Sequence, residues 1–256
     1  MLNSFYTQKN KFITADFSGR YVAELSKSTS IANFSEILPT DTLIYIAPID
    51  GTSIDEMVGT AARLRDEGFK VMPHFPARII KDKATLAEWI DRYTSEAGVK
   101  QALLLAGGVD EPTGDFESSM QLLETELFDK FGFTDLNVAG HPEGNKDIDL
   151  DNTSKNVDMA LEWKQKFSER TDASMGITTQ FAFESKPIFE WANRIQASGI
   201  NLPINVGVAG PAKLQTLIKF AIACGVGPSL KVLQKRAMDI TKLLLPYDPT
   251  DVLNEL

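Results

Sequence analysis

Short apolar runs alternate with longer segments of helical periodicity along almost the whole chain. The runs are apolar on both faces, which is typical of parallel strands covered by helices on each side. Seven such runs occur, at residues 20–26, 42–48, 69–75, 101–106, 134–140, 175–181 and 202–208. Seven repeating units of roughly 25–40 residues favour a (β/α)8 barrel over an open sheet. We therefore predict an α/β fold, a single TIM-type barrel domain over residues 1–256 whose eighth strand is missing or displaced.

The segment after the second run shows most clearly why helices are expected between the strands. Ile54, Met57 and Ala61 follow the spacing of one helix face. Ser53 precedes them as a candidate N-cap, and acidic residues occupy the first turn. This pattern predicts an amphipathic crossover helix.

The eighth strand of the barrel is not evident. Beyond residue 208 the sequence reads as a run of helices, and its last helix opens at Thr250 or Asp251. A barrel with a missing strand would leave two unpaired edges. The alternating segment 11–17 (KFITADF) is the preferred candidate to fill the gap. A neighbouring subunit in a homo-oligomer, covering the gap with residues 240–247, is the alternative.

Composition excludes several classes of function. The formal charge of −9 argues against a non-specific nucleic-acid binder. The one cysteine, Cys224, cannot form an internal disulfide, which suggests a reducing compartment. The chain has no apolar stretch of membrane-spanning length and no apolar segment of a secretory signal near its start. We expect a soluble, cytoplasmic protein. The acidic loop 109–119 lacks nearby His or Cys, so we expect no metal.

Unusual chemistry lies at the ends of several runs, where barrel enzymes place their sites. Glu24 sits within an apolar run, where a carboxylate is rarely tolerated without a partner or a role. His74 and His141, the two histidines of the chain, follow two other runs. Gln180 could form paired hydrogen bonds with a heterocyclic amide. Phe183 could stack on a flat ring, although core filling is the more frequent role of a phenylalanine.

An ordered set of motifs over about residues 20–235 resembles the methylenetetrahydrofolate reductase family of flavin-dependent barrels. The motifs are VAELSKST, VMPHF, LLLAGG, NVAGHPEGN, WKQKF, GITTQFAFE and INVGVAGPAKL. The pair HPE and ITTQFAF is the most specific of them. The resemblance implies hydride transfer that interconverts 5,10-methylenetetrahydrofolate and 5-methyltetrahydrofolate, with FAD as cofactor and NADH or NADPH as electron donor.

The resemblance also implies a role for each matching residue. Glu24 would be the acid that helps to protonate the folate. Gln180 would contact folate and nicotinamide, and Phe183 would lie at the substrate. The residues implied for flavin binding are His74, Ala106, Gly107, Gly108, His141, Glu143 and Lys166.

Departures from the family pattern concern the flavin most. Ala106-Gly107-Gly108 stands where the family turn usually has Arg-Gly-Asp, so a phosphate contact and a pterin contact are lost. The Pro-Pro that usually follows the first-strand glutamate is absent. A flavin-free enzyme, or a folate-binding or partner subunit without catalysis, is therefore the alternative to the flavoenzyme. A phosphate-handling aldolase is less consistent, because no run carries a lysine near its end.

Overall fold

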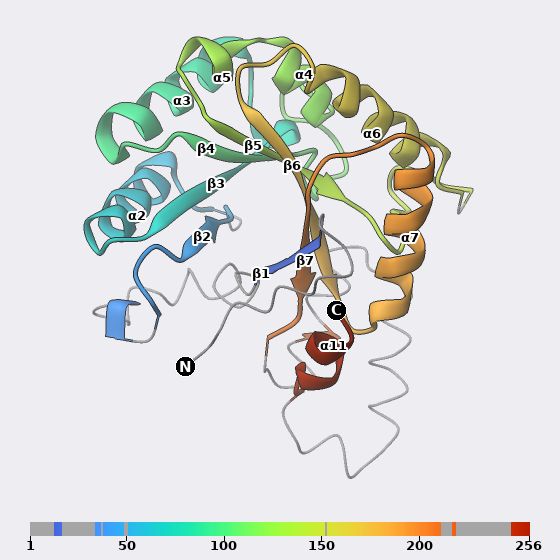
Figure 1. The fold of residues 1–256 in the computed structure, drawn as a ribbon. Coiled ribbons are helices and arrows are strands. Elements are labelled where there is room, and N and C mark those ends of the chain that lie inside the picture. Colours follow the sequence, from blue (N-terminus) through green and yellow to red (C-terminus); the bar gives the residue numbers. More distant parts are fainter. Residues whose placement is uncertain are drawn as a thin grey trace. The chain divides into compact units, whose positions relative to one another are not determined.

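The computed structural model describes residues 13–16, 34–36, 38–48, 51–151, 153–210, 217–218 and 247–256. Its strands are β1 Ile13–Asp16, β2 Leu43–Ile46, β3 Lys70–Pro76, β4 Gln101–Leu105, β5 Asp135–Gly140, β6 Ser174–Ala182 and β7 Ile204–Val208 (Figure 1). Its α-helices are α2 Ile54–Asp66, α3 Lys83–Ala97, α4 Ser119–Glu124, α5 Leu127–Lys130, α6 Lys155–Phe167, α7 Ser185–Ala197 and α11 Thr250–Glu255. Two 3-10 helices, η2 Phe34–Glu36 and η3 Ala77–Ile79, complete the described elements.

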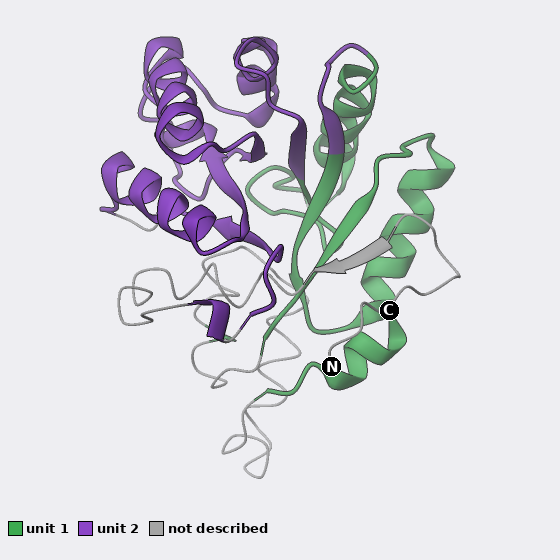
Figure 2. Cartoon of the chain, turned by 60° about the vertical axis from the view of Figure 1, so that its left-hand side comes forward, with its two compact units in different colours: residues 1–19, 139–169, 176–256 green, residues 20–138, 170–175 purple. Residues whose placement is uncertain are grey.

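The chain divides into two compact units, which Figure 2 shows in different colours. Unit 1 comprises residues 1–19, 139–169 and 176–256, and unit 2 comprises residues 20–138 and 170–175. The hydrogen-bonding order of the strands is β1-β7-β6-β5-β4-β3-β2.

Unit 2 contains a parallel sheet formed by β2, β3, β4 and β5. Leu43 pairs with Lys70, His74 with Leu103, and Leu103 with Asn137. Helices α2 and α3 lie beside each other along these strands (Figure 1). Ser53 caps α2 in a complete capping box, which confirms the predicted helix start.

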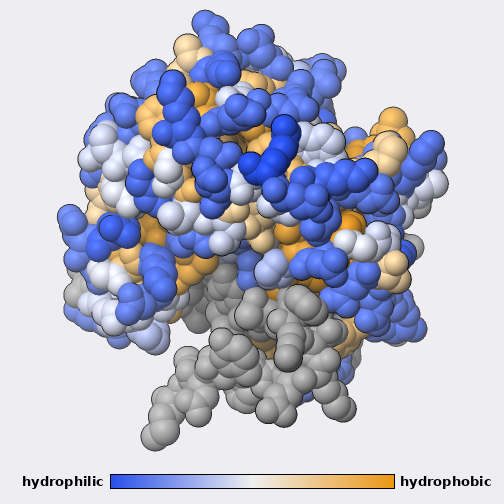
Figure 3. Space-filling model, turned by 45° about the horizontal axis from the view of Figure 1, so that its top comes forward, coloured by the Kyte–Doolittle hydropathy of each residue, from blue (hydrophilic) through white to orange (hydrophobic). Residues whose placement is uncertain are grey.

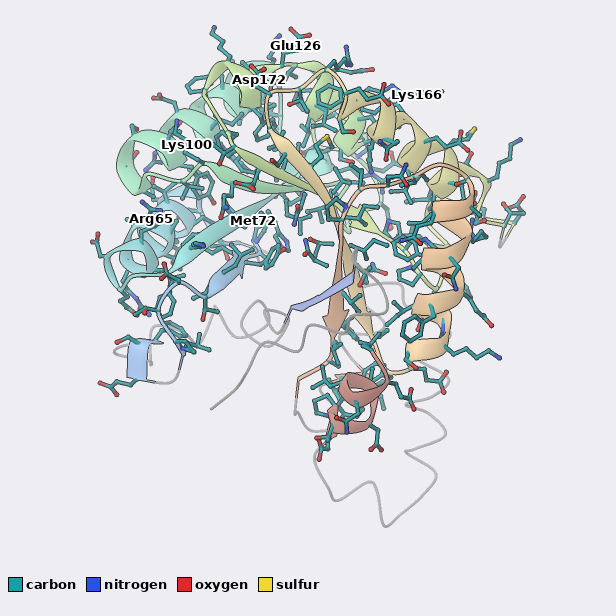
Figure 4. The ribbon with its side chains drawn as sticks, viewed as in Figure 1. Arg65, Met72, Lys100, Glu126, Lys166 and Asp172 are labelled. Carbon is teal, nitrogen blue, oxygen red and sulfur yellow. The ribbon has the colours of Figure 1, made fainter. Side chains whose placement is uncertain are left out.

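The two faces of the unit 2 sheet carry different side chains because successive strand residues alternate. On the helix side, the Phe75 ring packs against Tyr93 of α3 at 5.5 Å and Phe128 of α5 at 5.2 Å. On the other side, Tyr45, Met72 and Leu103 form a buried cluster (Met72 is labelled in Figure 4). This second face is also polar in part, because the Asn137 amide donates to the Tyr45 hydroxyl at 3.1 Å.

Unit 1 contains the parallel strands β1, β7 and β6. Ile204 pairs with Ile13 of β1 and with Ile177 of β6, so β7 lies between them. The pairing of β6 with β7 shifts register between Thr178 and Phe181, which marks a β-bulge at residues 179–180. Bulges redirect side chains, and this one precedes the end of β6.

The fold expectations are confirmed at the level of an α/β protein with a parallel sheet. Six of the seven apolar runs overlap strands β2 to β7, whereas the run at 20–26 lies outside the described residues. The segment 11–17 contains β1, which pairs with β7. The last helix begins at Thr250 as expected. An eighth strand is not among the elements of the described residues, and Cys224 and most of residues 240–247 lie outside them.

The surface of the described residues is mainly hydrophilic on the face shown in Figure 3, with scattered hydrophobic residues. Leu150 and Met159 are the large hydrophobic side chains most exposed to solvent among the residues that the structure describes. Among the same residues, no helix has the length and apolar character needed to cross a membrane.

Candidate functional site

The turn that follows β5 carries several polar side chains, among them His141, Glu143 and Asn145. His141 comes directly after the strand, and the Gly144 amide donates to the His141 carbonyl at 3.0 Å. Gly144 has a φ of 75°, a left-handed conformation that glycine adopts without strain. Asn145 continues the loop and accepts from the Asp149 amide at 2.9 Å. The loop thereby carries Asp149 to the start of α6.

Asp149 caps α6 from inside the protein. Its side chain is 2 % exposed, and its two carboxylate oxygens accept from the Asn156 amide at 2.8 Å and the Val157 amide at 3.1 Å. These amides have no partner within the helix, so a carboxylate at this position satisfies them and interacts favourably with the helix dipole. The charge of Asp149 is therefore buried but compensated.

His141 and Gln180 form a hydrogen-bonded pair between their side chains. Gln180 belongs to the bulge of β6, which accounts for its turn toward the end of β5. Burial, and secondarily the positive charge of Lys164, lower the pKa of His141 to about 4, whereas the hydrogen bond to Gln180 and the charge of Asp149 raise it. His141 is therefore neutral at pH 7.

The hydrogen bond with Gln180 occupies one ring nitrogen of His141. The other ring nitrogen, Nδ1, is buried and has no hydrogen-bond partner among the described residues.

Lys164 lies on the buried face of α6, together with Val157, Leu161 and Phe167. Its side chain is 6 % exposed, and burial lowers the pKa of its amine to about 8. A helical side chain leans toward the helix N-terminus, so Lys164 extends in the direction of the loop that carries Asp149. Its ammonium lies close enough to His141 to lower the pKa of that ring.

Trp191 of α7 approaches the same turn from another helix. A Cβ atom at Gly140 would lie 3.0 Å from Cη2 and 3.2 Å from Cζ2 of this indole. The absence of a side chain at Gly140 thus allows Trp191 to pack over the end of β5. The indole N–H of Trp191 is buried and has no acceptor among the described residues. Gly140, His141, Lys164 and Trp191 together define what we call the β5 cluster.

Phe183 belongs to the core of unit 1. It is 3 % exposed, and its ring meets Phe181 at 5.6 Å and Tyr247 at 5.0 Å, both edge-on. These contacts favour the core-filling interpretation over stacking on a ligand.

In unit 2, His74 lies on β3 and faces the Tyr45 ring edge-on at 6.0 Å. Burial lowers the pKa of His74 to about 4, so this ring is also neutral at pH 7.

The Ala106–Gly108 turn follows β4, and its Ala106 carbonyl accepts from the Arg78 amide at 2.9 Å. A Cβ at Gly107 would lie 3.1 Å from Pro76 Cβ, and the φ of Gly107 is 103°. Backbone geometry therefore explains this glycine without a ligand.

The guanidinium of Arg78, near this turn, holds the acidic loop in place. It donates to the carbonyl of Val109 at 3.0 Å and to that of Glu117 at 3.3 Å. Both contacts are with backbone carbonyls, so Arg78 serves the loop and does not replace the arginine missing from the turn.

Three predicted site residues stand apart from these contacts. Glu24 lies outside the described residues. Glu143 is partly buried in the turn after His141. Lys166 is exposed on α6, where Figure 4 labels it. No group of His, Cys, Asp and Glu that could hold a metal ion occurs among the residues described.

Sequence reasoning missed Lys164, Asp149 and Trp191. The helical period of α6 offered a signal for Lys164, because it lies three residues after Leu161 and seven after Val157. Lys166 lies two residues further on and falls on the exposed face of the same helix, although it is the lysine that matches the family motif.

Comparisons with known proteins add little. No protein-family model matches the sequence. A solved structure, dihydropyrimidinase from Brevibacillus agri NCHU1002, aligns with 90 % of this chain at 11 % sequence identity and a TM-score of 0.39. The alignment covers 52 % of that protein, so this chain spans about half its length. A similarity this weak supports no assignment of fold or function.

Proposed function

We propose that the chain is a methylenetetrahydrofolate reductase-like oxidoreductase that transfers hydride between a nicotinamide cofactor and a folate. The proposal rests on the ordered motif set of the sequence. The observation that best supports it is the hydrogen bond between Gln180 and His141. The resemblance to the family implies that both residues belong to one site, although their motifs lie about 40 residues apart in the sequence.

In this proposal Gln180 positions the reacting rings. Because its side chain is hydrogen-bonded to His141, the Gln180 amide is oriented before the ligand arrives. A preoriented amide loses less entropy when it binds folate or nicotinamide. Glu24 would hold the proton that is delivered to the folate nitrogen as the one-carbon unit is reduced. We place these roles at the mouth of a (β/α)8 barrel.

The described residues fit FAD only in part. Nδ1 of His141 offers a partner for a polar ring edge, and Glu143 lies in the same turn. The Ala106–Gly108 turn of unit 2 has no charged side chain for a diphosphate. Lys166, which the resemblance implies for that charge, is exposed on α6 of unit 1. When bound, FAD would carry hydride between nicotinamide and folate. The turn also favours the second candidate, a folate-binding or partner subunit without catalysis.

The experiment combines absorbance, binding and turnover in the purified full chain. A flavoenzyme shows visible flavin absorbance and converts methylenetetrahydrofolate with NADH or NADPH. Gln180→Ala should lower kcat/KM at least tenfold, whereas Lys155→Met, an exposed change on α6, should leave it unchanged. Folate binding without turnover would select the binding subunit. Neither folate binding nor turnover, with and without added FAD, would refute both.

A further inference from the structure

The bulge in β6 is held by the side chain of Thr179, which is 6 % exposed. The Thr179 hydroxyl accepts from the Gly207 amide of β7 at 2.9 Å. The same hydroxyl donates to the backbone carbonyl of Gln180 at 2.9 Å. A hydroxyl has one hydrogen to donate and lone pairs to accept with, so it can make both bonds at once. One buried side chain therefore joins the neighbouring strand to the backbone of the bulge.

Gly207 is the part of β7 that makes room for this bulge. Two residues of β6, Thr179 and Gln180, stand opposite one residue of β7. A Cβ atom at Gly207 would lie 2.8 Å from the Thr179 carbonyl oxygen and 3.1 Å from the carbonyl carbon and oxygen of Gln180. Such a contact with backbone atoms is too short for any side chain, so the glycine allows the bulged backbone to approach β7. Both strands are thus fitted to a bulge at this position.

The bulge decides where the Gln180 side chain points. Side chains of a regular strand alternate between its two faces, and an extra residue interrupts that alternation. The Gln180 side chain meets His141. Because the Gln180 carbonyl is held by the Thr179 hydroxyl, the backbone at Gln180 cannot rotate without breaking that bond. The backbone in turn fixes the direction of the Cα–Cβ bond from which the amide extends.

We propose that Thr179 is a positioning residue whose hydroxyl holds the bulge of β6 in the form that directs Gln180 to His141. Thr179 acts through Gln180 and has no contact of its own with a reacting group in this proposal. Its effect on catalysis rests on the proposed function, in which Gln180 orients folate and nicotinamide. Its effect on the contact between Gln180 and His141 does not, so the two can be tested separately.

The first test is NMR of the full chain with ¹⁵N-labelled histidine, in which His141 reports on unit 1 and His74 on unit 2. His74→Gln assigns the signals. Thr179→Val keeps the shape but removes the hydroxyl, so it should shift the ring signals of His141 and leave those of His74 unchanged. Thr179→Ser keeps the hydroxyl and should retain the wild-type signals of both rings. An unshifted His141 in Thr179→Val, or an equal shift in Thr179→Ser, would overturn the proposal.

Wild-type His74 signals also show that a variant is folded. If Thr179→Val does not fold, Thr179→Ala removes the same hydroxyl without adding an apolar group against the Gly207 amide, and it takes the place of Thr179→Val in the comparison.

The second test measures turnover of methylenetetrahydrofolate in single and double variants. Thr179→Val should lower kcat/KM by about 10–100-fold, because a small displacement of a positioning group has an effect of this size. Thr179→Ser should stay close to the wild type. In a Gln180→Ala protein the same Thr179→Val change should cause no further loss, because Thr179 acts through Gln180. A further loss of equal size would show that Thr179 acts elsewhere. A wild type without turnover would refute the proposed function, and the NMR comparison would still decide the role of Thr179.

Discussion

Replacing Lys164 by methionine should stabilise the protein. Burial lowers the pKa of this amine from 10.5 to about 8. At 1.36 kcal/mol per pKa unit, that drop corresponds to about 3 kcal/mol of free energy spent on keeping the amine charged at pH 7. Methionine has a similar unbranched shape and no charge, so Lys164→Met should recover up to about 3 kcal/mol.

The pH dependence distinguishes this cause from better packing. A lysine with a lowered pKa in the folded state destabilises the fold fully below about pH 8, where both states are protonated. Between about pH 8 and 10.5 the unfolded state binds more protons, so the wild type gains stability as the pH rises. The advantage of Lys164→Met should therefore shrink across this interval and vanish above it.

Urea unfolding at several pH values between about 7 and 10.5, followed by tryptophan fluorescence, measures the difference in unfolding free energy between Lys164→Met and the wild type. Lys155→Met should stay within about 0.5 kcal/mol of the wild type, as exposed substitutions do. A Lys164→Met protein that is less stable than the wild type at pH 7, by an amount independent of pH, would show that Lys164 has a counter-charge. The reasoning about the β5 cluster would then fail.

Three further predictions test other parts of the structure. Burial lowers the pKa values of His74 and His141 from 6.5 to about 4 in the folded protein, so the unfolded chain binds more protons between these pH values. The free energy of unfolding should therefore decline as the pH falls from about 6.5 to 4, and His74→Gln should reduce that decline in urea titrations. Gly140→Ala should destabilise the fold by about 1–3 kcal/mol, because the new Cβ would lie 2.5 Å from Ile177 Cγ2. It should also change tryptophan emission, because the same Cβ would lie 3.0 Å from Cη2 of Trp191. Unchanged emission and Tm would contradict the packing described. Glu24→Gln should preserve folate binding but lower turnover about 10²–10⁴-fold, and wild-type turnover would remove Glu24 from the proposed mechanism.

The sequence allowed the α/β pattern to be predicted because strand and helix periods differ strongly. Six apolar runs match strands, and the alternating segment that contains β1 was expected to close an edge. The bulge at residues 179–180 could not be predicted, since Thr178, Thr179 and Gln180 are all polar and nothing in the sequence marks which of them is the extra residue. That bulge accounts for how Gln180 reaches His141.

The candidate site was predictable only where a residue type was conspicuous. Two isolated histidines and one glutamine near strand ends attracted notice, and His141 and Gln180 prove to be in contact. Lys164 was not conspicuous, because a lysine on a helix is normally solvated. Its burial depends on which face of the helix packs against the sheet. Trp191 was equally inconspicuous, since its unsatisfied N–H exists only in the folded structure.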